Sequence, residues 1–263
     1  MTDFGMQTTI GTRHQVNEDS LGHAGESALW LVADGMGGHA AGDVASAIVR
    51  DRICEAVAGG SDLPAAISAA HLAVAASAAA EAGRKGMGST VVALRMIGSS
   101  AEIAWVGDSR AYLLRSGKLS RLTHDHTLVQ WLLDKGDISA EEAAVYPGKN
   151  VLVRTLGLEH PVVDETSVRL KRGDLLLLCS DGVTAELPED EIRTVLLDAD
   201  STQSAVDTLI RAVVERRGKD DASAIVIRID AQEKLSAGSW LPVVAGVGIG
   251  LGAYLIWTWM KAS

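Results

Sequence analysis

The stretch "LLLLCSDG", Leu175 to Gly182, changes abruptly from apolar residues to an aspartate and a glycine. An apolar run of this length with a turn-like end predicts a buried β-strand over residues 175–179. Asp181 follows that strand, and a carboxylate next to a buried strand needs a partner because an unpaired buried charge is costly. The chain repeats this arrangement, which makes its strand ends the candidate positions for a functional site.

Three other apolar segments are bordered by acids. "ALWLVADG" ends with Asp34 and Gly35, "AEIAWVGD" ends with Asp108, and "KDDASAIVIRI" begins with Asp220 and Asp221. The end of one antiparallel strand lies beside the start of its neighbour, so we expect these acids to meet at one rim of the sheets. Crowded carboxylates raise one another's pKa, and Mg²⁺ or Mn²⁺ would compensate their charge. The alternative is that Asp-Gly is simply a common turn dipeptide.

The upstream segment "GTRHQVNEDS" contributes Arg13, Glu18 and Asp19. An arginine fork binds phosphate through two hydrogen bonds, and carboxylates next to the direct ligands of a metal hold metal-bound waters. Two divalent cations beside a phosphate-binding arginine indicate phosphoester hydrolysis by a water molecule that bridges the metals. The sequence contains no GxxxxGK[ST] loop, GxSxG elbow or HExxH motif that would indicate another kind of catalysis.

Charge and cysteine content exclude several other classes of protein. The chain has 34 acidic residues against 24 lysines and arginines, a formal charge of −10, which argues against a nucleic-acid-binding protein and against a two-metal nuclease. Its two cysteines, Cys54 and Cys179, form no CxxC pair and predict buried free thiols in a reducing cytosol rather than a zinc site.

Strands outnumber helices in the predicted secondary structure, and the connections resemble hairpins. This pattern predicts an α+β fold in which antiparallel sheets are covered by helices. Strands are expected at 28–33, 91–96, 102–106, 175–179 and 223–229, a hairpin over 110–123 around Ser116–Gly117, and helices at 41–58, 63–83, 128–135, 140–145 and 203–217.

The segment Trp240–Met260 contains 21 residues without a charge. A helix of that length spans a hydrocarbon core of about 30 Å, and the tryptophans at both edges are typical of membrane interfaces. We therefore expect a catalytic domain over 1–230, a linker over 231–239 and a single transmembrane helix over 240–260. This tail anchor would hold a cytosolic domain at the inner (cytoplasmic) membrane, and its small-xxx-small glycines permit an anchor-mediated dimer. A buried core helix is the alternative.

Six segments, taken together, resemble a known family. They are "RHQVNED", "VADGMGGHAAGDVAS", "GMGSTVVAL", "WVGDSRAYLLRSGKLSRLTHDHT", "LLLCSDGVTAEL" and "KDDASAIVI". Their order and spacing resemble the metal-dependent protein phosphatases, the type 2C Ser/Thr class, bacterial branch, over about residues 5–230. The resemblance implies a central β-sandwich flanked by helices, Mg²⁺ or Mn²⁺ as cofactor, phosphorylated proteins as substrates, and a Ser/Thr protein kinase whose action is reversed.

The same resemblance implies roles for the acids. By position, Asp34 would bridge both catalytic metals and the Gly35 carbonyl would join it on one of them. Asp181 and Asp220 would complete the other metal. Asp108 would help Asp181 to hold a third, weaker ion.

Other residues would act on the substrate or through water. Asp19 and Glu18 would bind metal-bound water, Arg13 would hold the phosphate, and His39 is a candidate general acid for the leaving alkoxide. The family often has Asp-Asn where this chain has Asp220-Asp221, so either acid could serve as the ligand.

Substrate preference and activity leave alternatives open. The flap near 123–157 has Tyr146-Pro147 where the family usually has His-Pro, so no substrate preference carries over. A phosphatase dedicated to one phosphoserine switch protein is one alternative to broad specificity. A catalytically inactive, metal-binding regulatory scaffold is another, although such proteins usually lose a ligand acid and every expected acid is present here.

Overall fold

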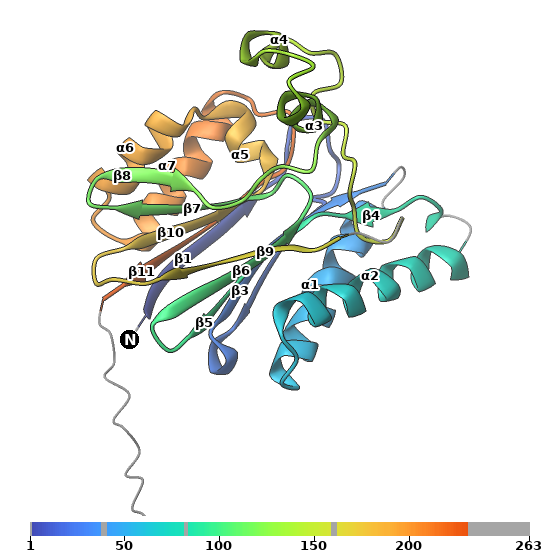
Figure 1. Ribbon diagram of the computed structural model, residues 1–263, viewed down its shortest axis with the longest axis horizontal. Helices are drawn as coiled ribbons and strands as arrows, with labels where there is room; N and C mark the ends of the chain where they lie inside the picture. Colours follow the sequence, from blue (N-terminus) through green and yellow to red (C-terminus); the bar gives the residue numbers. More distant parts are fainter. Residues whose placement is uncertain (1, 38–40, 82–83, 159–161, 231–263) are drawn as a thin grey trace, which may run out of the picture. The chain divides into compact units, whose positions relative to one another are not determined.

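The computed structural model describes residues 2–37, 41–81, 84–158 and 162–230. Two antiparallel β-sheets form its centre (Figure 1). The five-stranded sheet has the order β1-β11-β10-β7-β8, and the other has the order β2-β3-β5-β6-β9 with β4 paired to β3.

The strands and helices are as follows. The first sheet contains β1 (Thr2–Thr9), β7 (Arg110–Arg115), β8 (Lys118–Arg121), β10 (Leu175–Cys179) and β11 (Ala222–Ile229). The second contains β2 (Asp19–Ala24), β3 (Leu29–Met36), β4 (Gly88–Ser89), β5 (Val91–Ile97), β6 (Ser100–Val106) and β9 (Asp164–Arg169). The helices are α1 (Gly42–Ala58), α2 (Leu63–Ala80), α3 (Leu128–Lys135), α4 (Ala140–Ala144), α5 (Asp181–Glu186), α6 (Glu189–Asp198) and α7 (Thr202–Glu215), with the 3₁₀ turn η1 (Gly25–Ser27).

The central strands are buried on both faces, which explains their nearly continuous apolar sequences. In β3, Trp30 and Val32 pack in the core between the sheets, while Leu29, Leu31 and Ala33 pack toward α1 and α2. Because side chains alternate across a strand, one apolar run supplies two cores. A third core lies between the five-stranded sheet and α5–α7.

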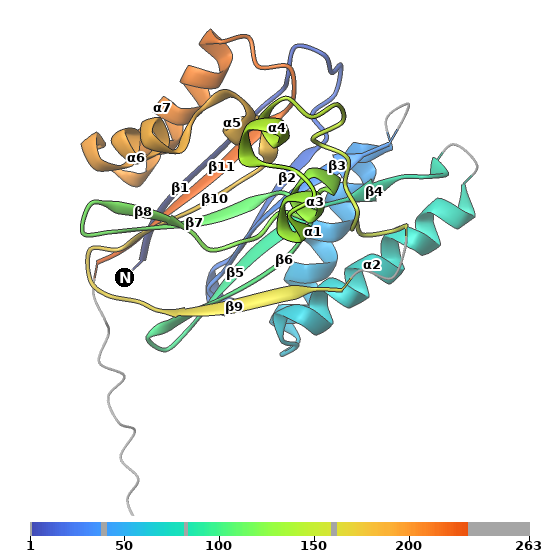
Figure 2. The same ribbon diagram turned by 45° about the horizontal axis from the view of Figure 1, so that its top comes forward.

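Helices cover both outer faces, as Figures 1 and 2 show. The longest of them, α2, is the one helix in the described residues that is long and apolar enough to cross a membrane by length and composition. It buries Ile67, Ala70 and Val74 against the core that it shares with α1. Asp62 caps its first turn by accepting a hydrogen bond from the Ala65 amide. A core helix of the domain accounts for these contacts.

The structure confirms the sandwich of two antiparallel sheets flanked by helices. The expected strands, the five expected helices and the hairpin are present, and Ser116 and Gly117 both have the positive φ that a tight hairpin turn requires. Two details differ from the predictions: β3 continues past Asp34 to Met36, and Asp181 opens the helix α5.

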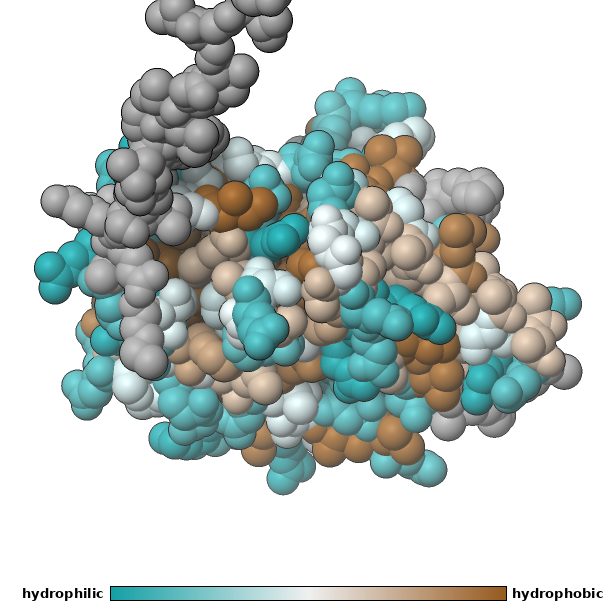
Figure 3. All heavy atoms as spheres, turned by 90° about the horizontal axis from the view of Figure 1, so that it is seen from below, coloured by the Kyte–Doolittle hydropathy of each residue, from teal (hydrophilic) through white to brown (hydrophobic). Residues whose placement is uncertain are grey.

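Several elements were missed because they lack an apolar run. β1, β2 and β9 carry polar or small residues at many positions, α5 is short, and the first turn of α6 is acidic. On the face seen from below in Figure 1, hydrophilic and hydrophobic residues are interspersed (Figure 3). The predicted linker, the predicted transmembrane helix and His39 lie outside the described residues.

Candidate active site

A cavity of about 240 Å³ opens at one end of the sandwich, beside the segment that follows α4. Six of the seven residues predicted to bind metal line it: Glu18, Asp34, Gly35, Asp108, Asp181 and Asp220. The structure therefore brings together carboxylates that lie up to about two hundred positions apart in the sequence.

Strand pairing within each sheet and the stacking of the sheets produce this convergence. Asp181 follows β10 and Asp220 precedes β11, and these strands are antiparallel neighbours in one sheet. Asp34 lies in β3 and Asp108 follows β6, two strands of the other sheet that both pair with β5. Each sheet contributes two acids, and the sandwich places the two pairs at the same end.

Asp19, the seventh residue, lies directly opposite Asp34 in the β2–β3 pair. Its Oδ2 atom accepts a hydrogen bond of 2.7 Å from the Ser180 hydroxyl, which itself accepts one of 2.9 Å from the Ser223 amide. Ser180 and Ser223 belong to the five-stranded sheet region, so this contact ties the two sheets together behind the cavity. Two carboxylates directly opposite each other on neighbouring strands are destabilising unless a cation compensates them.

The electrostatics of the site reflect this crowding. Burial raises the pKa of Asp34 well above its usual range, and the charges of Asp19, Asp181, Asp108 and Asp220 add to the rise. Burial also raises the pKa of Asp19 to about 7, while burial and the charge of Asp220 raise that of Asp181 to about 6. The pKa of Asp108 is raised by burial and by Asp181. Without a positive charge, several of these groups hold protons near neutral pH.

Two observations fit a bound cation. Asp19 Oδ1 and Asp181 Oδ1 are buried and have no hydrogen-bond partner in the part of the chain that is described. Gly35 lines the same cavity and brings a backbone carbonyl group to it. Carboxylate and carbonyl oxygens are the donors that Mg²⁺ and Mn²⁺ prefer.

The ligands are not preassembled. No group of three or more His, Cys, Asp or Glu side chains among the described residues is already arranged to hold a metal ion. The carboxylates line a shared cavity instead of converging on one point, so the fit rests on the cavity lining and on the unpartnered oxygens.

The structure distinguishes Asp220 from Asp221. Asp221 is 2% exposed, and its two oxygens accept hydrogen bonds from the Gly11 amide at 2.7 Å and the Glu18 amide at 2.6 Å. Asp220 has a side chain that is 48% exposed, and it lines the cavity. Asp220 is thus the acid available to a metal, while Asp221 fastens the loop that carries Glu18.

The structure places Arg13, the residue predicted to hold the phosphate, outside the cavity lining. Arg13 is exposed and is not among the residues that line the cavity. Its neighbour His14 does line it, with Nδ1 2.9 Å from Asp221 Oδ2. Burial alone would lower the pKa of His14, but hydrogen bonding to Asp221 and the nearby carboxylates raise it overall. The sequence offered no signal for this beyond the position of His14 next to Arg13.

Other residues that support the site were also missed. The Thr90 hydroxyl accepts a hydrogen bond of 3.2 Å from the Asp34 amide and lies 2.7 Å from the Ser109 hydroxyl. The Gly107 amide donates to His126 Nδ1 at 3.1 Å, and Gly107 has a φ of 109°, a conformation that favours glycine. Thr90 directly precedes the apolar run of β5 and Ser109 directly follows Asp108, which is the only local clue to their role.

Comparisons with known proteins agree with this geometry. A family model described as protein phosphatase 2C matches residues 8–223. The serine/threonine phosphatase stp of Listeria monocytogenes serovar 1/2a is 38% identical over 242 residues, which cover 87% of this chain and 96% of that protein. The crystal structure of the Mycobacterium tuberculosis serine/threonine phosphatase PstP/Ppp has a TM-score of 0.81 and 34% identity, covering 88% of this chain and 99% of that one.

A further solved structure bears on the cation site. The catalytic domain of the serine/threonine phosphatase PstP in complex with 2 manganese ions has a TM-score of 0.77 and 32% identity, covering 88% of this chain and 99% of that one. The matching family model, the sequence identity and the shared fold agree with the gathering of the acids at one end of the sandwich. The chain belongs to the protein phosphatase 2C family.

Proposed function

We propose that this chain removes phosphate from phosphoserine and phosphothreonine side chains of proteins with two divalent cations, Mg²⁺ or Mn²⁺, and that Asp108 and Asp181 hold a third. As a member of the protein phosphatase 2C family, the chain is a metal-dependent protein serine/threonine phosphatase. The observation that carries the proposal is the gathering of Asp34, Asp181 and Asp220 around one cavity. Cations held there would lower the pKa of a bound water and supply the nucleophile.

The chain's own residues have separate tasks in this proposal. Asp34, Gly35, Asp181 and Asp220 hold the cations in the cavity. Asp19 accepts a hydrogen bond from the Ser180 hydroxyl and lies opposite Asp34 in the β2–β3 pair, from where it would orient water bound to a cation.

Two further groups would act on the phosphate itself. His14 is the basic residue that lines the carboxylate cavity among the described residues, and it would face a bound phosphate there, while Arg13 is exposed and does not line the cavity. His39, outside the described residues, is proposed to protonate the departing serine or threonine oxygen.

Turnover of a phosphothreonine peptide by the purified chain with Mn²⁺ tests the activity. The Asp34→Ala variant should lose at least about a hundredfold in kcat/KM, because it removes a carboxylate that would hold the cations in the cavity. Asp51→Ala is the matched control, since that acid is exposed and pairs only with Arg50 among the described residues. Normal rates for Asp34→Ala would overturn the role of Asp34 at the cation site. No turnover by the parent with metal bound would overturn the proposed activity and favour an inactive scaffold.

The role of His39 has its own test. p-Nitrophenolate leaves without protonation, whereas an alkoxide requires an acid. His39→Ala should therefore lose much more kcat on a phosphothreonine peptide than on p-nitrophenyl phosphate. Equal losses on both substrates would remove the general-acid assignment.

We also propose that residues 240–260 anchor the enzyme at the inner membrane beside a Ser/Thr kinase. Their 21 uncharged residues and flanking tryptophans support this proposal. Tethering raises the local concentration of the phosphatase near membrane-bound substrates. Deleting residues 236–263 should move the protein from the membrane to the soluble fraction, and unchanged membrane association would refute the anchor. Loss of crosslinked dimers in Gly246→Leu would support pairing through the glycines.

A further inference from the structure

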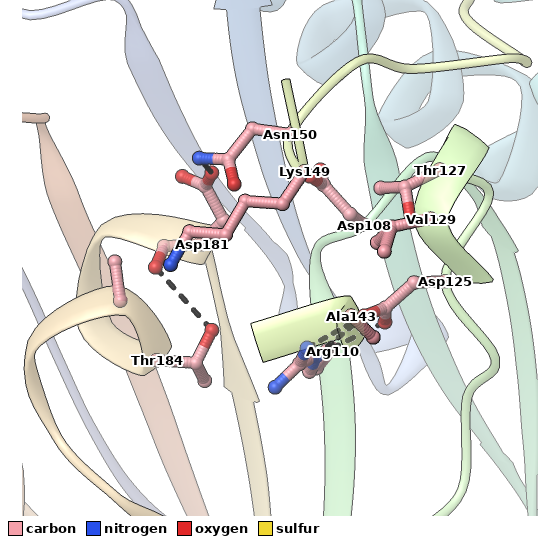
Figure 4. Close-up of a pocket in the computed structure, with 11 residues that line it drawn as sticks. Asp108, Arg110, Asp125, Thr127, Val129, Ala143, Lys149, Asn150, Asp181 and Thr184 are labelled. Carbon is pink, nitrogen blue, oxygen red and sulfur yellow. Dashed lines mark hydrogen bonds and ion pairs between the residues drawn. The ribbon is translucent and has the colours of Figure 1, made fainter. Parts of the chain in front are cut away.

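A second cavity of about 170 Å³ adjoins the carboxylate cavity. It lies between the segment that contains α3 and α4 and the first turn of α5, as the close-up in Figure 4 shows. Asp108, Asn150 and Asp181 line both cavities. A substrate whose phosphate occupies the carboxylate cavity would therefore place a neighbouring part of its chain in the second one.

The charges that face the second cavity can be assigned one by one. Arg110 is engaged by Asp125, to which it donates from Nε at 3.0 Å and from Nη2 at 2.6 Å. Asp108 and Asp181 face the cation centre under the proposed function, where bound metal offsets their charge. Asp125 also lies 3.4 Å from Arg121, so its charge is compensated twice.

Lys149 is the charged lining residue that has no partner of opposite charge among the described residues. Its side chain extends across the cavity toward Asp181 (Figure 4), and it forms no ion pair with any other described residue. The rest of the lining is uncharged, with Thr127, Asn150 and Thr184 beside Val129, Ala143 and Ala185. A bulk water occupies about 30 Å³, so the volume suits one side chain of moderate size.

We infer that the second cavity is a subsite for a substrate residue close to the phosphorylated one, and that Lys149 favours an acidic side chain there. The inference rests on the proposed function and names a substrate preference for that same site. An ammonium group without a partner attracts a carboxylate, while the small apolar lining residues accommodate its methylene groups. The recognition would come from this chain's own flap sequence, in which Lys149 follows Tyr146-Pro147 by two positions.

The test uses phosphothreonine peptides that differ only by Glu or Gln at each position from three residues before the phosphothreonine to three after it. At one position, Glu should be preferred over Gln by roughly two- to fivefold in kcat/KM, because an exposed ion pair contributes little in water. The preference should appear in KM rather than in kcat and should weaken at high salt.

Variants at Lys149 then assign the preference. The Glu-to-Gln ratio should fall to about one in Lys149→Ala, persist in Lys149→Arg, and reverse in Lys149→Glu, which should prefer a Lys-containing peptide instead. Lys135→Ala is the matched control, since that flap lysine lies 3.6 Å above the Trp131 ring and does not line the cavity. Binding of the same peptides with a non-hydrolysable phosphothreonine analogue, followed by fluorescence anisotropy, should show the same order.

The outcomes separate this inference from the proposed function. Hydrolysis of all peptides without any Glu preference, or a preference that survives in Lys149→Ala, overturns the subsite while leaving the phosphatase intact. Absence of hydrolysis for every peptide, with metal bound, overturns the proposed function and the subsite with it.

Discussion

Replacing Asp19 by Asn should make the metal-free protein more stable. Asp19 lies opposite Asp34 and is buried, and its pKa rises from the usual 3.8 to about 7. Each pKa unit corresponds to about 1.4 kcal/mol, so ionising this group costs the folded state about 4 kcal/mol at pH 8. Part of that gain is lost because the neighbouring carboxyls ionise more fully once Asp19 is neutral. We therefore expect a net stabilisation of about 2–4 kcal/mol.

The pH dependence gives the sign of the effect. When folding raises the pKa of an acid, that acid does not lower the free energy of unfolding below its unfolded-state pKa. Its destabilising effect then grows as the pH rises from the unfolded-state pKa to the folded-state pKa. For Asp19 this window runs from 3.8 to about 7. The advantage of the Asn variant should therefore shrink to about 1 kcal/mol at pH 5, where only the lower part of the window contributes. The Asn oxygen can still accept the hydrogen bond from Ser180.

Urea unfolding in the presence of a chelator, at pH 8 and at pH 5, measures this difference. Saturating Mn²⁺ should abolish the advantage, since cations bind the parent site and stabilise it. Asp51→Asn, at an exposed position, should change stability by no more than about 0.5 kcal/mol. The reasoning is refuted if the Asn variant is no more stable than the parent at pH 8, or if the difference does not depend on pH.

Three other predictions follow from the same site. Asp221→Ala should destabilise the chelated protein by about 2–4 kcal/mol in thermal unfolding, because the Gly11 and Glu18 amides lose their acceptor; an unchanged melting temperature would contradict this. Gly182→Ala should lower the free energy of unfolding in urea by at least about 3 kcal/mol, because the added Cβ would lie 2.0 Å from the Asp221 carbonyl oxygen. A decrease of less than about 1 kcal/mol would show that the backbone adapts to the added methyl group. Mn²⁺ affinity should fall from pH 8 to pH 6, because protons compete with the metal for Asp19 and Asp181, whose pKa values are about 7 and about 6. Calorimetry in two buffers should also show protons released on binding. An affinity that does not change with pH would contradict this prediction.

Local patterns were sufficient for the elements with strong signals. The apolar run before Asp181 predicts β10, and the turn at Ser116–Gly117 predicts the β7–β8 hairpin, because hydrophobic periodicity and turn chemistry act over a few residues. The edge strand β2 has the sequence DSLGHA, which carries no such run, and it was missed. Its pairing with β3, which sets Asp19 against Asp34, was missed with it.

The sequence alone was enough to identify the acids as a group beside apolar strands, although β3 continues past Asp34. The convergence of Asp181 and Asp220 follows from the antiparallel pairing of β10 and β11, as expected from the sequence. The sequence also predicted that Asp34 and Asp108 join them at one rim, but the pairing argument alone does not reach across two sheets. The tertiary structure supplies that step, since the packing of two sheets depends on contacts between residues far apart in the chain.

Tertiary structure likewise decides between neighbours that the sequence treats as equivalent. Hydrogen bonds from distant amides occupy Asp221 and leave Asp220 facing the cavity, and the path of the loop turns His14 inward while Arg13 stays in solvent. These residues lie in loops, where no regular periodicity sets the direction of a side chain, so that direction is fixed by which remote groups satisfy the backbone and the buried charges.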